Sequence, residues 1–273
     1  MGRRHPPRLL SIAGSDSGGG AGIQADLKAF AACGAHGMTA ITAITVQSTV
    51  AVSAVHPVPA DVIVDQVRAV AQDIGVDAVK VGMLGTVEAI VAVETALGLV
   101  GGAPVVLDPV MVAESGGTLL DDGALDALRT RLVPLAAVLT PNLPEARLLA
   151  GAGAEADGEV ARAVHALGAA AVVITGGHRE QATDLYFDGD ELVAIPGERH
   201  PDGAAHGSGC THSSALAAHL ALGYAPLEAA RRARAIAEEA IGNALRSLGE
   251  GAGPVDVVGL KPPAAAPGQP GAG

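Results

Sequence analysis

Residues 9–26 read LLSIAGSDSGGGAGIQAD, a short apolar run followed by a glycine-rich turn and a helical pattern. The apolar run at 9–13 is typical of a buried strand, and the pattern over about 21–34 is typical of a helix. Glycine permits the tight turn between them because it lacks a Cβ atom. A strand that passes through such a turn into a helix predicts the opening unit of an α/β fold.

The same alternation continues along the chain. Further strands are predicted over 38–46, 78–81, 105–107, 137–139 and 171–174, and helices over about 59–74, 86–98, 121–132, 143–150, 157–167, 209–222 and 226–247. The segment 184–196 predicts a β-hairpin, because a polar Asp-Gly-Asp separates two apolar runs. Buried strands alternating with helices predict a mostly parallel sheet covered on both faces, with ligands beyond the carboxyl ends of its strands.

The composition limits both the core and the partners. With 273 residues the chain can form one large domain, and its core must be aliphatic because only 1% of residues are aromatic. We predict a single domain over 8–260, with disordered tails at 1–7 and 261–273. The formal net charge of -12 argues against nucleic acid or an anionic membrane as the main partner.

Other global features predict a soluble protein of the cytoplasm. The two cysteines, Cys33 and Cys210, are too few for a disulfide framework and lack the spacing of metal sites. The basic start at 1–8 is followed by an apolar run that Ser11 and Gly14 interrupt, unlike the apolar region of a signal peptide. No stretch is apolar enough to span a bilayer.

A second glycine-rich turn, HGSGCT at 206–211, opens a run of small residues. A helix starting here would direct free N–H groups and the positive end of its dipole toward an anion. We expect the same field to lower the pKa of Cys210, whereas Cys33 is predicted to be core packing. An anion cradle beside a potential base is what transfer of a phosphoryl group to a hydroxyl requires.

Candidate metal ligands follow two of the predicted strands. Asp108 follows 105–107, and Asn142 and Glu145 follow 137–139, one helical turn apart. Two carboxylates at neighbouring strand ends suit a hydrated Mg²⁺ that bridges phosphates. The spacing of Asn142 and Glu145 also matches a helix capping box, and both roles can hold together. The glycine-bearing segment 113–118 is predicted to be a mobile lid.

The remaining polar candidates have open interpretations. Residues 20–25 match the dinucleotide pattern GxGxxA, but no acidic residue follows between Asp26 and Asp61, where that site requires one. Asp26 is either a polar ligand anchor or a favourable charge near a helix N-terminus. The amide of Gln47 suits the edge of a heterocycle, and Met83 suits a pocket wall. A solvated loop glutamine and a core methionine would explain these two residues without a ligand.

Six motifs, in this order, resemble one family: GSDSGGGAGIQADLK at 14–28, VGML at 81–84, LDPVM at 107–111, TPNLPEA at 140–146, TGGH at 175–178 and HGSGCT at 206–211. Together they resemble the hydroxymethylpyrimidine/phosphomethylpyrimidine kinases of thiamine biosynthesis, within the ribokinase-like superfamily. The resemblance implies a three-layer αβα sandwich with a mostly parallel sheet and a small β-hairpin. It also implies two successive ATP-dependent phosphorylations of 4-amino-5-hydroxymethyl-2-methylpyrimidine, first on the hydroxymethyl group and then on the resulting phosphate.

The resemblance also implies residues for the pyrimidine. Gly14, Asp26 and Gln47 would hold the ring, and Met83 and Val110 would pack around it. We further expect the protein to form a homodimer.

For ATP and Mg²⁺, the resemblance implies a second group of residues. Asp108 and Glu145 would serve the phosphates and hold Mg²⁺ through water, with Asn142 and Thr175 beside the nucleotide. Cys210 would take the proton from the attacking hydroxyl. The anion hole would consist of four consecutive backbone amides, those of Gly207, Ser208, Gly209 and Cys210.

Three positions depart from the family pattern. Ser208 replaces the usual Thr, Thr175 replaces a common Lys, and Ala252 replaces a common His. The change at Thr175 removes a positive charge near the nucleotide phosphates, which puts stabilisation of the γ-phosphate in question.

Other functions stay open at this stage. A pyridoxal kinase could use the same scaffold, because some relatives accept that aldehyde and a reactive cysteine could engage it. The lost charge at Thr175 would suit a nucleotide-binding module without catalysis, although Asp108, Glu145 and Cys210 argue against one. A hydrolase built on Cys210 and His212 would need an orienting acid, and we expect none beside His212.

Overall fold

The computed structural model describes residues 5–111, 120–121, 123–151, 156–176, 182–200 and 205–260. The predicted lid at 113–118 and the predicted tail at 261–273 lie outside these residues. Residues 1–4 of the other predicted tail, and Gly177 and His178 of the TGGH motif, also lie outside them.

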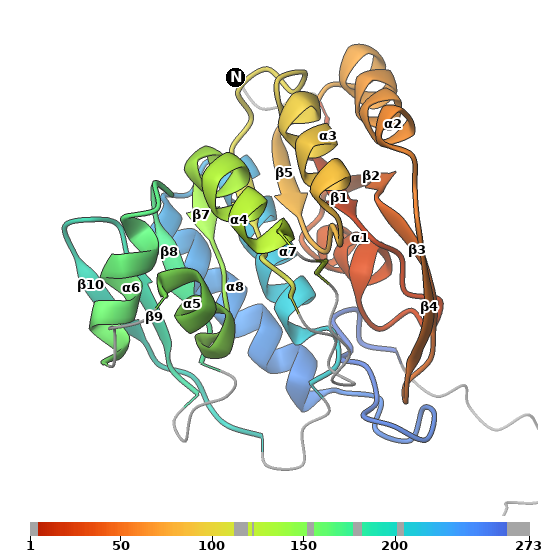
Figure 1. Ribbon diagram of the computed structural model, residues 1–273. Helices are drawn as coiled ribbons and strands as arrows, with labels where there is room; N and C mark the ends of the chain where they lie inside the picture. The colour runs from red at the N-terminus through yellow and green to blue at the C-terminus, as the bar shows by residue number, and fades with distance from the viewer. Residues whose placement is uncertain are drawn as a thin grey trace, which may run out of the picture.

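Within the described residues, eight strands form one sheet in the order β10-β9-β8-β7-β6-β5-β1-β2 (Figure 1). The strands from β8 to β2 run parallel, and β9 and β10 form an antiparallel hairpin at one edge. The strands are β1 (Arg8–Ala13), β2 (His36–Ile41), β5 (Ala78–Val81), β6 (Val105–Leu107), β7 (Val138–Leu139), β8 (Val172–Ile174), β9 (Asp184–Phe187) and β10 (Leu192–Ile195). The mostly parallel sheet and the hairpin at 184–196 are confirmed.

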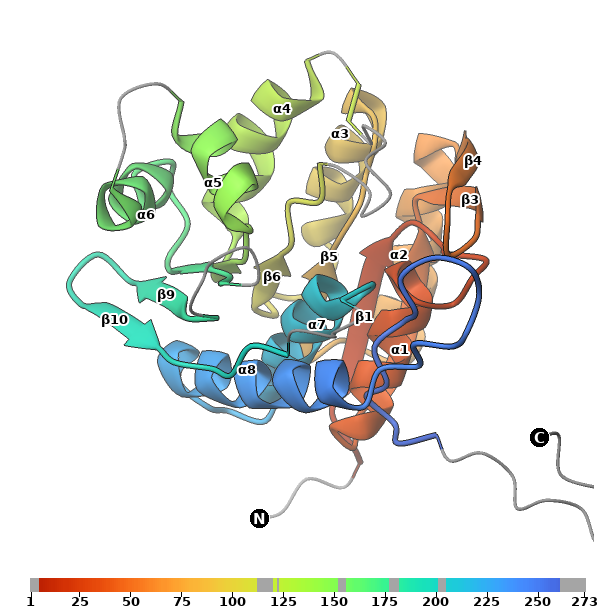
Figure 2. The same ribbon diagram turned by 90° about the horizontal axis from the view of Figure 1, so that it is seen from below.

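Helices cover both faces of the sheet, as Figure 2 shows. One face packs against α1 (Gly22–Ala32), α7 (Ser208–Ala221) and α8 (Pro226–Gly242). The other face packs against α2 (Ala60–Asp73), α3 (Val87–Leu97), α4 (Ala124–Ala127), α5 (Leu143–Ala150) and α6 (Asp157–His165). The three-layer αβα arrangement is therefore confirmed.

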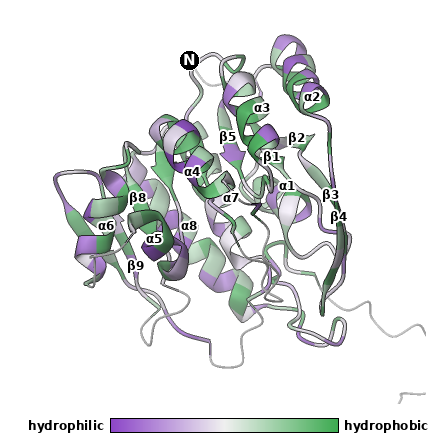
Figure 3. Cartoon of the chain, in the orientation of Figure 1, coloured by the Kyte–Doolittle hydropathy of each residue, from purple (hydrophilic) through white to green (hydrophobic). Residues whose placement is uncertain are grey.

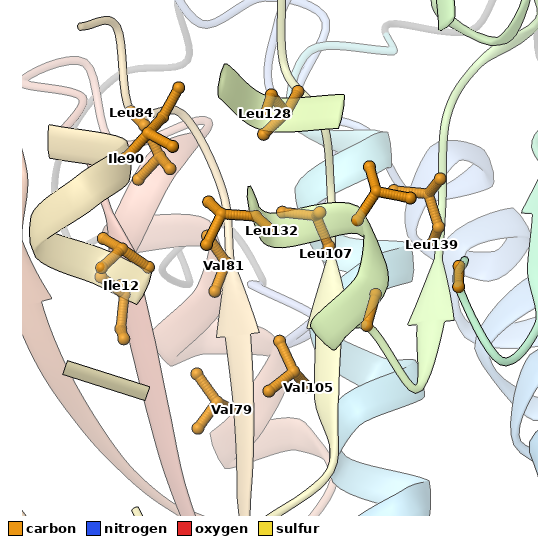
Figure 4. Packing of buried hydrophobic residues seen from close by; sticks show 14 of the residues in the cluster. Ile12, Val79, Val81, Leu84, Ile90, Val105, Leu107, Leu128, Leu132 and Leu139 are labelled. Carbon is orange, nitrogen blue, oxygen red and sulfur yellow. The ribbon is translucent and has the colours of Figure 1, made fainter. Parts of the chain in front are cut away.

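Alternate side chains of a strand enter different cores. Val105 and Leu107 of β6 belong to the cluster beneath α2–α6, whereas Val106 packs with α1, α7 and α8. This division follows because successive side chains of a strand point to opposite faces. Figure 4 shows part of the first cluster, with Ile90 of α3 and Leu132 beside the strand residues. In Figure 3, α2, α5 and α6 carry hydrophilic as well as hydrophobic residues, as expected of helices with one face on a sheet.

The single strand predicted over 38–46 is wrong, because the chain changes sheets within it. β2 ends at Ile41, and β3 (Ala43–Gln47) pairs with β4 (Val52–Pro57) in a separate two-stranded antiparallel sheet. Thr42 lies at the break, where its N–H donates to the Ala13 carbonyl and its hydroxyl donates to the Met83 carbonyl. The apolar pattern runs through this break without interruption, so it did not reveal the break or β4.

Two predicted helices differ in extent. The helix predicted over 121–132 is α4 followed by a π-helical turn at Leu128–Leu132 and a 3-10 turn at Val133–Leu135. The helix predicted over 226–247 ends at Gly242. Among the described residues, none of the helices has the length and apolar character needed to cross a membrane.

Candidate active site

The segments that follow the parallel strands contact one another at the carboxyl ends of the strands. After β1, the Gly14 N–H donates to the Met83 carbonyl at 3.2 Å, and a Cβ on Gly14 would lie 2.3 Å from the Met83 Cε. After β7 and β8, Asn142 pairs with Thr175 in a parallel bridge, and the Thr175 N–H donates to the Pro141 carbonyl at 2.9 Å. Gly14, Met83, Asn142 and Thr175 thus lie at the carboxyl ends of the parallel strands, whereas Asp26 lies within α1 and Gln47 in the separate β3–β4 sheet.

The N-terminus of α7 has open amide groups. Gly207 has a φ of 84° and precedes the helix, and no side chain caps the helix there. The Ser208 N–H donates to the Ala205 carbonyl at 2.8 Å. Among the described residues, the N–H groups of Gly207, Gly209 and Cys210 have no acceptor. Three of the four predicted amides are therefore available to an anion.

In the glycine turn after β1, the backbone amides donate to a carboxylate of the same turn, that of Asp16. Asp16 accepts hydrogen bonds from the N–H groups of Gly18, Gly20 and Ala21 at 2.8–2.9 Å, and the His206 Nε2 lies 3.0 Å from its Oδ2. Burial alone would raise the pKa of Asp16, but these hydrogen bonds lower it overall. Sequence analysis missed Asp16 and His206, although an Asp before several glycines is a turn signal.

A fully buried lysine lies beneath the site. Lys80 of β5 places its Nζ 2.8 Å from Asp26 Oδ1 and 3.9 Å from Asp108 Oδ2. The Asp26 carboxylate also accepts hydrogen bonds from Ser11 at 2.6 Å and from Ser214 at 2.8 Å. The Asp26 carboxylate is thus already paired with protein groups. Neither sequence interpretation of Asp26 described this buried ion pair. A lysine inside the apolar strand AVKV was the signal for this network.

Asp108 lies between this lysine and α7. The residue is buried, and its carboxylate accepts a hydrogen bond from the Ser213 hydroxyl at 2.9 Å. Burial raises the pKa of Asp108, and the positive charge of Lys80 only partly opposes this effect.

Asn142 and Glu145 form the predicted capping box at the start of α5. Each backbone N–H donates to the other side chain at 2.9 Å, and Glu145 also accepts from the Met111 N–H at 3.3 Å. Burial raises the pKa of Glu145 to about 8, and the charge of Asp108 adds to the effect. Two buried carboxylates that repel each other would be relieved by a cation.

Cys210 is half-buried at the start of α7. Burial raises the pKa of its thiol to about 12, while the charge of Lys80 lowers it and the carboxylates of Asp26 and Asp108 raise it. The prediction that the helix field would lower this pKa is therefore wrong in sign. Desolvation is the largest cause, and it outweighs the favourable charge of Lys80.

The described structure places an acid beside His212, contrary to the sequence expectation. Asp184 Oδ2 lies 3.3 Å from the His212 Nε2, and Asp184 also accepts the Gly176 N–H at 2.7 Å. Cys210 and His212 are two residues apart on α7, however, and helix positions at that spacing do not face each other. The parts of a cysteine hydrolase are therefore not assembled.

The other predicted pyrimidine contacts occupy the rim of the site. Gln47 is half-buried at the end of β3, where its Oε1 accepts from the Thr45 hydroxyl at 3.3 Å and its N–H donates to the Ser17 hydroxyl at 2.8 Å. Val110 is half-buried after β6. The Ser17 contact ties Gln47 to the glycine turn after β1.

A cavity of about 860 Å³ lies between β10 and α8. Its walls include Arg234, Glu238 and Gly242 of α8 and Ile195 of β10. The end of α8 is connected to the anion site, because the Val255 N–H donates to the His206 carbonyl and the next residue donates to the carbonyl of Ala240. Sequence analysis did not predict this cavity.

Open amides at a helix N-terminus, a nearby sulfur and two buried carboxylates at strand ends are the parts of a phosphotransferase. On this three-layer fold they define a small-molecule kinase of the ribokinase-like type.

Comparisons with known proteins identify the family. A family model described as phosphomethylpyrimidine kinase matches residues 16–256. The hydroxymethylpyrimidine/phosphomethylpyrimidine kinase of Rhizobium meliloti is 51% identical over 253 residues, which cover 90% of this chain and 95% of that protein. The chain belongs to the phosphomethylpyrimidine kinase family.

Solved structures of two differently named kinases have the same fold as this chain. The pyridoxal kinase of Staphylococcus aureus in complex with ADP gives a TM-score of 0.84 at 37% identity, covering 93% of this chain and 94% of that one. The phosphomethylpyrimidine kinase of Clostridium difficile 630 gives a TM-score of 0.76 at 39% identity, covering 86% and 99%. The two enzyme names on one fold agree with the rule that a shared fold does not decide the substrate.

Proposed function

We propose that this protein transfers the γ-phosphoryl group of ATP to 4-amino-5-hydroxymethyl-2-methylpyrimidine and then to its monophosphate, in thiamine biosynthesis in the cytoplasm. The observation that carries the proposal is the open N-terminus of α7, where three amides have no acceptor among the described residues. Such amides stabilise the charge of a phosphoryl group in transfer. Residues 8–260 would act as one catalytic unit.

The pyrimidine would lie against the turn after β1. Contact between Gly14 and Met83, and the tie from Gln47 to the same turn, support this position. Val110 would close the opposite side. Asp26 is the least supported of these candidates, because protein groups already fill its carboxylate.

Cys210 would accept the proton of the attacking hydroxyl. In the free protein its pKa of about 12 keeps the sulfur protonated at neutral pH, so the base must form as the substrates bind. Neutralising Asp108 would remove one of the charges that hold this proton on the sulfur.

Asp108 and Glu145 fit Mg²⁺ held through water. Both are buried carboxylates with raised pKa values, and a divalent ion would relieve their repulsion. The described residues contain no cluster of three or more metal-ligating side chains, so water and phosphate oxygens would complete the shell. When bound, Mg²⁺ supplies charge neutralisation for the phosphates. Thr175 and Asn142 would lie beside them, and the cavity along α8 would take the nucleoside.

We propose a homodimer through the outer face of the β3–β4 sheet. Ile44 and Val46 are 53% and 51% exposed on the same face of β3, and apolar side chains grouped on a surface are typical of an interface. A double substitution, Ile44→Ser with Val46→Ser, should convert the dimer to a monomer in sedimentation experiments.

The assay that tests the proposed function offers three acceptors in parallel, with ATP and Mg²⁺. These are the hydroxymethylpyrimidine, its monophosphate and pyridoxal. Phosphorylation of both pyrimidines, with little pyridoxal phosphate, supports the proposal. ATP binding without any product would indicate a nucleotide-binding module instead.

A pyridoxal kinase is the second candidate. It is favoured by the solved pyridoxal kinase, whose TM-score of 0.84 exceeds the 0.76 of the phosphomethylpyrimidine kinase. A preference for pyridoxal of tenfold or more in kcat/KM, about 1.4 kcal/mol in transition-state binding, would move the protein to that function.

A further inference from the structure

Lys80 is a charged residue in the interior of the described structure. Its side chain is completely buried in the middle of β5, and an ammonium there is tolerated only with charged partners. One carboxylate in contact would suffice for that purpose. Lys80 instead has two, Asp26 at 2.8 Å and Asp108 at 3.9 Å.

A glycine beside the ammonium leaves room for it. A Cβ on Gly82 would lie 2.7 Å from the Lys80 Nζ and 3.0 Å from the Ala13 Cβ, so an alanine there would require the ammonium to shift. Val79 and Val81 face the opposite core, so Lys80 points into the layer of α1 and α7.

The network reaches the reacting groups through α7. Ser214 donates to Asp26, and Ser213 donates to Asp108, both from the first turns of the helix that carries Cys210 at its start. Lys80 therefore contacts α1 and the residue after β6, and through these two carboxylates it is linked to α7. Its positive charge also opposes the effect of burial on the pKa of Cys210.

We propose that Lys80 is a positioning residue of this kinase, whose buried ammonium fixes Asp26, Asp108 and the first turns of α7 relative to one another during phosphoryl transfer. The inference rests on the proposed function. A structural ion pair would need only Lys80 and Asp26, whereas a positioning role requires the second link to Asp108.

The test separates the two roles with a charge-neutral pair. Lys80→Met alone leaves Asp26 buried without its cation and should lower both the melting temperature and kcat. Lys80→Met combined with Asp26→Asn removes both charges and should recover most of the melting temperature. We expect kcat of the double variant to stay about 100-fold below wild type, with both KM values within about threefold, because a lost contact between Asp26 and the pyrimidine would raise the KM for the pyrimidine. Recovery of kcat together with stability would overturn the proposal.

Two further variants keep the test decisive. Gly82→Ala retains every charge but displaces the ammonium, and it should lower kcat by about tenfold in a folded protein. An unchanged kcat in Gly82→Ala would overturn the proposal even if the double variant fails to fold. Val79→Ala, on the other face of β5, should lower stability without changing kcat. Failure of the proposed function is seen separately, as absence of pyrimidine phosphorylation by the wild type. In that case kcat of the Lys80 variants is measured with the acceptor that the wild type phosphorylates.

Discussion

The glycine turn after β1 and the glycine turn before α7 are similar in sequence but differ in what satisfies their amide groups. In the first turn, Asp16 accepts hydrogen bonds from three amides. In the second, the N–H groups of Gly207, Gly209 and Cys210 have no acceptor among the described residues. The two turns touch, since a Cβ on Gly207 would lie 1.7 Å from the carbonyl oxygen of Gly20.

The difference follows from one acidic side chain. The first turn contains Asp16, whereas no Asp or Glu occurs between Asp202 and Glu228. A glycine-rich helix entrance binds an external anion only when the chain does not supply one itself. The first turn is thus closed by its own carboxylate, and under the proposed function the second would receive the phosphoryl group. The predictions below test this division.

The largest effect is expected for Cys210→Ser, at the open turn. A serine hydroxyl occupies the same position but is a far poorer proton acceptor, so kcat should fall by about 10²–10⁴-fold. Affinity for ATP, measured by calorimetry, should change little because the amides remain. Cys33→Ser is the matched control, since that thiol packs on α1 away from the site. A near-normal kcat for Cys210→Ser would assign the proton to another group.

The next effect is expected for Gly207→Ala, where the two turns meet. The added Cβ would collide with the Gly20 carbonyl, and the φ of 84° is unfavourable for alanine. We expect kcat/KM for ATP to fall by about 100-fold as the amides move. Gly223→Ala is the control for strain alone, because its φ is 92° and a Cβ there meets nothing within 4 Å. Equal kinetic losses in both variants would contradict the role of the contact.

The sequence predicted the open turn more reliably than the closed one. Strand–helix alternation predicted a mostly parallel sheet covered on both faces. The six ordered motifs predicted Asp108, Glu145 and Cys210 as site residues. Hydrogen-bond partners such as Asp16 with His206 could not be predicted, because they join segments 190 residues apart. The predicted direction of the pKa shift of Cys210 was wrong for the same reason. Burial and the carboxylate of Asp26 raise this pKa, and both depend on tertiary packing.

A smaller effect is expected for Asp16→Asn, at the closed turn. The amide replaces one acceptor oxygen and removes the charge, so the free energy of unfolding at pH 7 should fall by about 1–3 kcal/mol. The pKa of Asp16 is lowered in the folded protein, so its contribution is present above the ordinary value of 3.8. It is lost as the pH falls through the lower folded value. Urea unfolding of variant and wild type should therefore converge in acid, and a constant difference would show that the carboxylate charge is not the cause.

The last prediction concerns the cation proposed beside Asp108 and Glu145, and it is tested with Glu145→Gln, whose effect on kcat is expected to be smaller than those at the two turns. The pKa of Glu145 is about 8 in the folded protein against an ordinary 4.5, so its protonated form favours folding. This contribution is complete below pH 4.5 and is lost as the pH rises through 8. Without Mg²⁺, the wild type should lose unfolding free energy across this window, by at most about 1.4 kcal/mol per pH unit. The loss should be shallower in Glu145→Gln and unchanged in Glu88→Gln, an exposed control on α3. Added Mg²⁺ should flatten the wild-type curve by stabilising the charged carboxylate, and equal slopes in all three proteins would show that Glu145 is not the group that holds the proton.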